Sequence, residues 1–195
     1  MTIMKKRRRQ QLMAKPLPAP WLACIQRNVP YFTCLPEKNK KRLQGLVQVF
    51  LAEKHFEGCG GLEITDEIRL TIAAQACMLL LGLENDFSPM LQSILVYPHT
   101  YASPLRERLP DGSVVESFQE RLGETWSQGS LGLVWDDVKR STADIHDGHN
   151  VVFHEFAHQL DYESGAAEGA PRLPTRSRYV SWARVLGGAY EALLK

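Results

Sequence analysis

Apolar residues recur at helical spacing in two long stretches of the chain. The stretch that opens at Pro36 has one apolar face, formed by Leu43, Leu46, Val47, Phe50 and Leu51. This spacing predicts an amphipathic helix with a proline in its first turn. A second helix is predicted from Asp66 to about Gly82, with Thr65 as its cap. It is apolar nearly all round, which is typical of a helix at the centre of a core.

Three further helices are predicted by shorter patterns. They cover Trp21 to Asn28, about Asn150 to Tyr162, and about Arg178 to the end of the chain. Asn150 is a favourable N-cap for the second of these, and Gly165 is a plausible stop for it.

Short runs of β-favouring residues lie between the predicted helices. They are Ser93–Tyr97, Val114–Phe118 and Ser130–Trp135, and prolines and an Asp-Gly turn signal separate them. No alternation of strands and helices is visible. The pattern therefore predicts an α+β fold with a small sheet.

Composition excludes several classes of protein. The 195 residues are 44% hydrophobic and 23% charged, with a net charge of +1, which is unlike a disordered chain, a collagen-like fibre or a disulfide-stapled miniprotein. The net charge hides an asymmetry. Residues 1–42 hold 11 of the 23 Lys and Arg and one acid, a balance of +10, whereas residues 43–195 hold 12 basic and 21 acidic residues, a balance of −9.

The basic residues concentrate in the run KKRRR at Lys5–Arg9. Such a run can bind nucleic acid or an anionic membrane face. No zinc-finger spacing, recognition helix or aromatic interleaving accompanies it, so residues 1–20 are expected to be a flexible, solvated tail without a direct nucleic-acid partner. The longest apolar run, Leu70–Leu83, is interrupted by Gln75 and is shorter than the roughly 20 residues that a bilayer requires. We expect a cytoplasmic protein without a membrane span.

One segment carries recognisable chemistry, the HExxH sequence formed by His154, Glu155 and His158. Residues four apart lie on one helix face, so the two histidines can direct their imidazoles at one metal ion. Zn²⁺ suits neutral imidazole nitrogens and keeps a position for water at catalytic sites. Glu155 can reach that water as a general base. The alternative is that the histidines are ordinary core or surface residues and Glu155 a solvated charge; the cap and apolar face of the helix favour the metal site.

A third ligand is needed, because catalytic zinc normally has three from the protein. No histidine follows His158, and Asp161 stands where the metzincin motif has glycine, which excludes that class. The acids downstream are Asp161, Glu163, Glu168 and Glu191. Only Glu191 lies on a predicted helix, and a solvated helix face is the favoured interpretation of it.

The HExxH sequence lies in a longer and more specific block. DGHNVVFHEFAHQLD at 147–161, with GETW at 123–126 and WDDV at 135–138, resembles the Mlc titration factor A (MtfA) family of bacterial zinc-dependent peptidases. Further matches cover essentially the whole chain: TDEIRLTIAAQA at 65–76, Tyr97-Pro98 with Thr100-Tyr101, and the basic head leading to NVPY at 28–31.

This resemblance implies a zincin-like fold related to the catalytic domain of anthrax lethal factor, in residues 21–195. It implies His154 and His158 as zinc ligands and Glu155 as the general base of an aminopeptidase-like enzyme. It also implies a regulatory role through binding of Mlc, the repressor of glucose phosphotransferase genes. A non-catalytic binding protein or an inactive fragment of such an enzyme are the alternatives.

The sequence departs from the family pattern at one point. The family takes its third ligand from a glutamate in an E-[FC]-F-A-type helix well downstream of HEFAH, and no such motif occurs here. The resemblance therefore implies that the C-terminal part of the domain is lacking. The loss of one ligand of three is expected to weaken metal binding and activity.

Overall fold

A computed structural model describes residues 3–83, 91–99, 102–108, 114–120, 129–162, 173 and 175–194. The chain divides into two compact units, residues 1–159 and 160–195. The helices are α1 (Ile3–Ala14), α2 (Ala19–Asn28), α3 (Glu37–Glu53), α4 (Asp66–Met78), α5 (Trp135–Ala143), α6 (Val151–Tyr162) and α7 (Arg176–Leu193), with a short 3-10 helix at Pro30–Phe32. The strands are β1 (His55–Gly58), β2 (Ser93–Tyr97), β3 (Ala102–Arg108), β4 (Val114–Glu120) and β5 (Ser130–Val134).

Three strands form a small parallel sheet in the order β1-β2-β5. His55 pairs with Ser93, and Ser93 pairs with Ser130. Helix α4 lies between β1 and β2 in the chain and connects these two parallel neighbours. The small sheet is confirmed, but the expected segregation of strands from helices is wrong, and the architecture is mixed α/β with mostly helices. Strand β1 was not predicted, because its four residues are exposed or half-buried and carry no apolar alternation.

The other two strands pair with each other. Strands β3 and β4 form an antiparallel hairpin, with Ala102 opposite Glu120 and Arg108 opposite Val114. The predicted strand at Val114–Phe118 corresponds to β4. Strand β3 was not predicted, since it contains Pro104, and proline lowers the expectation of a strand.

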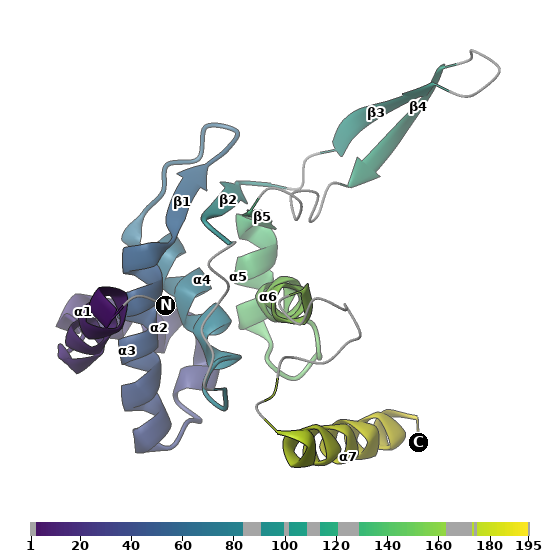
Figure 1. Ribbon diagram of the computed structural model, residues 1–195. Coiled ribbons are helices and arrows are strands. Elements are labelled where there is room, and N and C mark those ends of the chain that lie inside the picture. The colour runs from purple at the N-terminus through teal and green to yellow at the C-terminus, as the bar shows by residue number, and fades with distance from the viewer. Residues whose placement is uncertain are drawn as a thin grey trace. The chain divides into compact units, whose positions relative to one another are not determined.

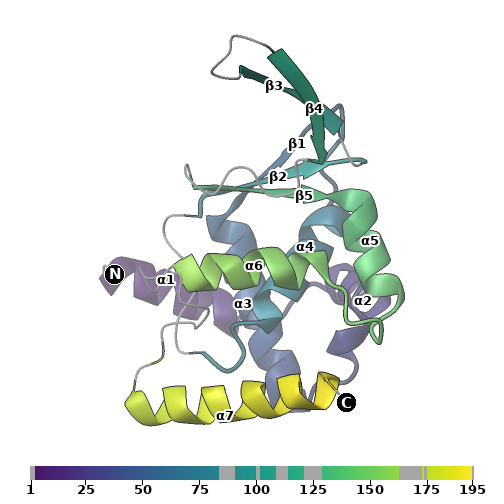
Figure 2. The ribbon, with the colours of Figure 1, turned by 90° about the vertical axis from the view of Figure 1, so that its right-hand side faces the viewer.

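The core lies between one face of the parallel sheet and the helices α3, α4 and α6, which Figures 1 and 2 show on the same side of the strands. Alternate residues of two strands are buried: Ile94, Val96, Leu131 and Leu133. Helix α4 is buried along nearly its whole length, from Leu70 to Cys77. Its predicted cap is confirmed, since the Ile68 N–H donates to Thr65 Oγ1 at 3.3 Å.

The N-terminal segment, which the sequence predicts as part of a basic tail, forms helix α1. Arg9 donates to both carboxylate oxygens of Glu53 on α3, each at 2.6 Å, and Lys5 Nζ lies 3.4 Å from the same carboxylate. A Cβ at Gly45 would lie 3.2 Å from the Cα of Met13, so a glycine in α3 lets the two helices approach closely. The run of like charges disfavours a helix by itself, and Glu53, 44 residues away, compensates part of that charge.

Among the helices of the described ranges, none combines the length and the apolar character needed to cross a bilayer.

Candidate active site

Helix α6 carries the HExxH sequence, and side chains bind its first free N–H groups. The Phe153 N–H donates to Asn150 Oδ1 at 2.8 Å, which confirms the predicted N-cap. The Val151 N–H donates to Ser141 Oγ of α5 at 3.0 Å. Both contacts satisfy donors that have no partner within the helix.

Apolar residues fix which face of α6 is buried. Val152 and Phe156 are fully buried, and the Phe156 ring packs against Phe50 of α3 with centroids 5.8 Å apart. Phe153 packs on Tyr31 at 5.3 Å. Because these rings hold one face of α6 in the core, the opposite face is left to His154 and His158, both exposed.

The two histidines converge. Their Nε2 atoms lie 3.2 Å apart, and their rings are nearly perpendicular, with centroids 4.6 Å apart. Two nitrogens bound to a tetrahedral Zn²⁺ at about 2.0–2.1 Å lie about 3.3 Å from each other. The pair therefore fits two positions of a zinc coordination sphere. Within the described part of the chain, no group of three or more His, Cys, Asp or Glu side chains could hold a metal ion.

Glu155 lies between the two histidines in sequence but in a different environment. Its residue is 7% exposed. Burial raises the pKa of its carboxyl group, and the neighbouring His154 and His158 oppose that rise in part. A carboxylate with a raised pKa is a stronger base, which suits proton transfer near neutral pH.

The sequence analysis also named other acids downstream of this pair. Glu191 lies on α7 in the second unit with an exposed side chain, and its role as a ligand stays a prediction. Asp161 is half-buried on α6. Glu163, Gly165 and Glu168 lie outside the described residues.

The structure adds supporting residues that the sequence analysis did not assign. Ser141 is buried, and its Oγ donates to the Asp137 carbonyl at 2.8 Å while it accepts from α6. Tyr31 Oη donates to the Ile145 carbonyl at 3.5 Å. Gln75 of α4 contacts Asn150. Of these, only Gln75 gave a signal in the sequence, because it interrupts the apolar run Leu70–Leu83.

Comparison with known proteins decides the family. The model of the glucose-regulated metallo-peptidase M90 family matches residues 3–195. The chain belongs to this family. The M90 family is a family of metallopeptidases, which agrees with the converging histidines of α6, and the resemblance to the MtfA proteins is confirmed.

Bacterial relatives share much of the chain. The uncharacterized protein slr2042 of Synechocystis sp. is 42% identical over 190 residues, which cover 96% of this chain and 68% of that protein. Proteins of Escherichia coli and Shigella boydii, both named Mlc titration factor A, are 29% identical over 158 residues. These residues cover 80% of this chain and 58% of each relative, so the match spans less than two thirds of the proteins that bear that name.

Proposed function

We propose that this chain acts as a zinc-dependent peptidase with aminopeptidase-like specificity. One observation carries the proposal: the two imidazole Nε2 atoms of α6 lie 3.2 Å apart on an exposed face, next to a buried carboxylate. Family membership supports a metal and a peptidase reaction. The restriction to N-terminal residues of peptides rests on the resemblance to the MtfA proteins.

A bound zinc ion would supply Lewis acidity, which polarises a peptide carbonyl and makes a water molecule more acidic. His154 and His158 would hold it through their Nε2 atoms. The Glu155 carboxylate would take the proton from the attacking water and pass it to the nitrogen of the leaving amine. Burial of Glu155 raises the pKa of its carboxyl group, which makes the carboxylate a stronger base for this proton.

A third protein ligand completes most catalytic zinc sites. The sequence offers Glu191 for this role, and a solvated face of α7 is the alternative. Glu191→Gln separates the two: a tenfold or larger loss of zinc affinity supports the ligand, and an unchanged affinity supports the solvated face.

The proposed peptidase activity is tested by measuring the zinc stoichiometry of the purified chain and its cleavage of chromogenic aminoacyl substrates. Glu155→Gln keeps the shape of the side chain and removes the base, so we expect zinc binding to persist while kcat falls at least 100-fold. Glu63→Gln, at an exposed position before α4, is the matched control. Full activity of Glu155→Gln would rule out this mechanism. A wild-type chain that binds no zinc and cleaves nothing would support the inactive fragment.

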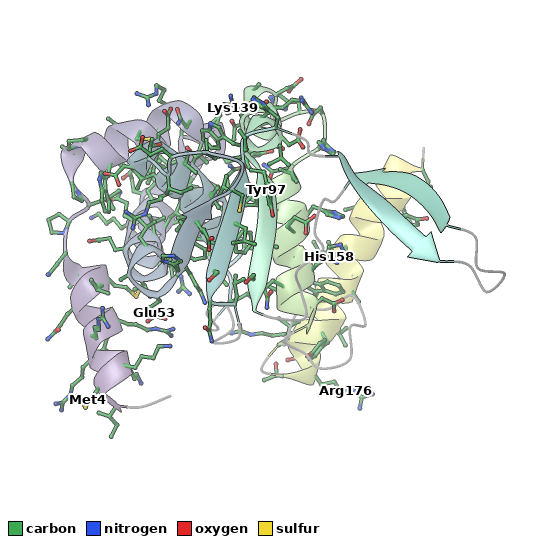
Figure 3. All side chains as sticks on the ribbon, turned by 90° about the horizontal axis from the view of Figure 1, so that it is seen from above. Met4, Glu53, Tyr97, Lys139, His158 and Arg176 are labelled. Atoms are coloured by element: carbon green, nitrogen blue, oxygen red, sulfur yellow. The ribbon has the colours of Figure 1, made fainter. Side chains whose placement is uncertain are left out.

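A second candidate function is binding of the repressor Mlc. It is favoured by the relatives named Mlc titration factor A and by the basic surface of α1, where Lys6, Arg7 and Arg8 are exposed. Viewed from above the sheet, α1 with Met4 lies beyond β1, whereas His158 lies beyond β5 (Figure 3). The basic surface and the histidine pair are therefore separate, and both functions can coexist in one chain.

Binding of Mlc is tested by a pull-down with the purified repressor. The full chain is compared with a chain lacking residues 1–20 and with a variant in which Lys6, Arg7 and Arg8 are replaced by glutamate. Arg9 is retained in that variant, because it holds α1 on α3. Retention of Mlc by the wild type and its loss in the charge-reversal variant would assign binding to α1. No complex with the wild type would exclude this function.

A further inference from the structure

A glutamine lies in the middle of the core helix α4. The Gln75 residue is fully buried, and alanines flank it on both sides. A buried amide without hydrogen bonds is costly, so its partners explain its presence. One partner is in its own helix, where Gln75 Nε2 donates to the Thr71 carbonyl at 3.2 Å.

The second hydrogen bond of Gln75 reaches the start of α6. Gln75 Oε1 accepts from Asn150 Nδ2 at 2.8 Å, and Asn150 Oδ1 accepts from the Phe153 N–H at 2.8 Å. Three hydrogen bonds in series thus join the Thr71 carbonyl of α4 to the Phe153 N–H of α6. We refer to this series through Gln75 and Asn150 as the amide relay.

The direction of each bond in the amide relay is fixed by its two ends. A carbonyl only accepts, so the amide nitrogen of Gln75 faces Thr71 and its oxygen faces Asn150. A backbone N–H only donates, so the oxygen of Asn150 faces Phe153 and its nitrogen faces Gln75. Serine, threonine or aspartate would also cap the helix. An asparagine caps it and donates to Gln75 as well, which explains the residue type at 150.

We infer that Gln75 is a positioning residue for the HExxH helix. Through its bond to Asn150, Gln75 sets the rotation of the first turn of α6. His154 is the fourth residue of this helix, so its position depends on that rotation. A rotation by about 10° moves an atom about 6 Å from a helix axis by about 1 Å. Displacements of that size at reacting groups can reduce rates about 100-fold. The effect of Gln75 on metal binding and catalysis rests on the proposed function. Its effect on the position of α6 does not depend on that function.

The first test uses the full chain without metal and a matched pair of variants. Gln75→Leu keeps an apolar side chain of similar size and removes the amide relay. Thr71→Val, also buried and on the same helix, loses the bond from Asn28 Nδ2 at 3.1 Å but keeps the backbone carbonyl of the relay. We expect hydrogen exchange at the Phe153 amide to rise about tenfold in Gln75→Leu and to stay within twofold in Thr71→Val. The imidazole NMR signals of His154 should shift only in Gln75→Leu.

A second variant removes the same bond from the other side. Asn150→Ser keeps a cap for α6 but cannot donate to Gln75, and it serves equally if Gln75→Leu does not fold. Each single variant leaves one polar group of this hydrogen bond without its partner, whereas the double variant removes both groups. The effects on the His154 signals should therefore be less than additive in the double variant.

Zinc affinity is the functional measurement. We expect Gln75→Leu to weaken zinc binding about tenfold and Thr71→Val to leave it unchanged. Equal behaviour of Gln75→Leu and Thr71→Val, in both Phe153 exchange and the His154 signals, would overturn the inference. A wild-type chain without zinc affinity would contradict the proposed function instead, while exchange changes confined to Gln75→Leu and Asn150→Ser would still support the amide relay.

Discussion

His154 and Glu155 are neighbours in the chain, yet His154 is exposed whereas Glu155 is buried. Successive residues of an α-helix point about 100° apart. With Phe156 fixed in the core, Glu155 falls beside the buried face and His154 on the open one. The helix therefore presents both imidazoles to solvent and keeps the carboxylate buried.

The exposure of His154 predicts that its loss affects metal binding far more than folding. In His154→Ala, zinc affinity should fall at least tenfold, because one of two converging imidazoles is lost. The free energy of unfolding of the metal-free chain should change by less than about 0.5 kcal/mol. Chelator competition and urea denaturation measure the two effects. His55→Ala, at an exposed position of β1, should change neither.

The ion pair between Arg9 and Glu53 predicts a loss of stability in acid. Hydrogen bonds from Arg9 hold the pKa of Glu53 below its ordinary value of 4.5. The pair therefore stabilises the fold above about pH 4.5, and this contribution is lost as the pH falls through the lower pKa of the folded state. Glu53→Gln should reduce the free energy of unfolding by about 2 kcal/mol at pH 7.

Urea denaturation from pH 7 to pH 3 measures this contribution. The wild type should lose more stability on acidification than Glu53→Gln, because the variant has already lost the charged pair. Glu57→Gln, exposed on β1, is the control and should follow the wild type. Parallel curves for the wild type and Glu53→Gln would show that the pair does not stabilise the fold.

Two glycines predict opposite outcomes for the same substitution. A Cβ at Gly58 would clash with the Leu62 carbonyl oxygen at the end of β1, whereas a Cβ at Gly82 would meet no atom within 4 Å. Gly58→Ala should destabilise the chain by about 1–3 kcal/mol, since backbone has to move. Gly82→Ala should stay within about 0.5 kcal/mol of the wild type. Thermal unfolding of both variants checks this; equal melting temperatures would contradict the close approach at Gly58.

The cysteines predict a difference in reactivity towards a thiol reagent such as DTNB. Cys34 is exposed, whereas Cys77 is buried in α4, and burial raises the pKa of its thiol. The thiolate is the reactive form, so Cys77 should react only as fast as the chain unfolds. Cys34→Ser should remove a fast phase of labelling, and Cys77→Ser only a slow one. Fast labelling assigned to Cys77 in native buffer would contradict its burial.

Strong local patterns predicted most of the described helices. The spacing of Leu43, Val47 and Phe50 predicted α3, and the apolar run capped by Thr65 predicted α4. Helix α4 ends at Met78, whereas the predicted end was about Gly82. Strand β2 was predicted with its observed bounds. The parallel order of the sheet was not predicted, because β1 is short and carries no apolar alternation.

Local sequence was enough to predict the chemistry of the site: HExxH predicts two ligands and a base, and helical spacing puts the histidines on one face. Tertiary structure decided what surrounds them. The Phe50 ring packs on Phe156 and holds that face of α6 in the core, and the start of α6 depends on Gln75 and Ser141, which lie on other helices. Helix α1 likewise depends on Glu53. These contacts join residues far apart in the chain, and local periodicity carries no information about which distant side chain supplies a missing donor, acceptor or charge.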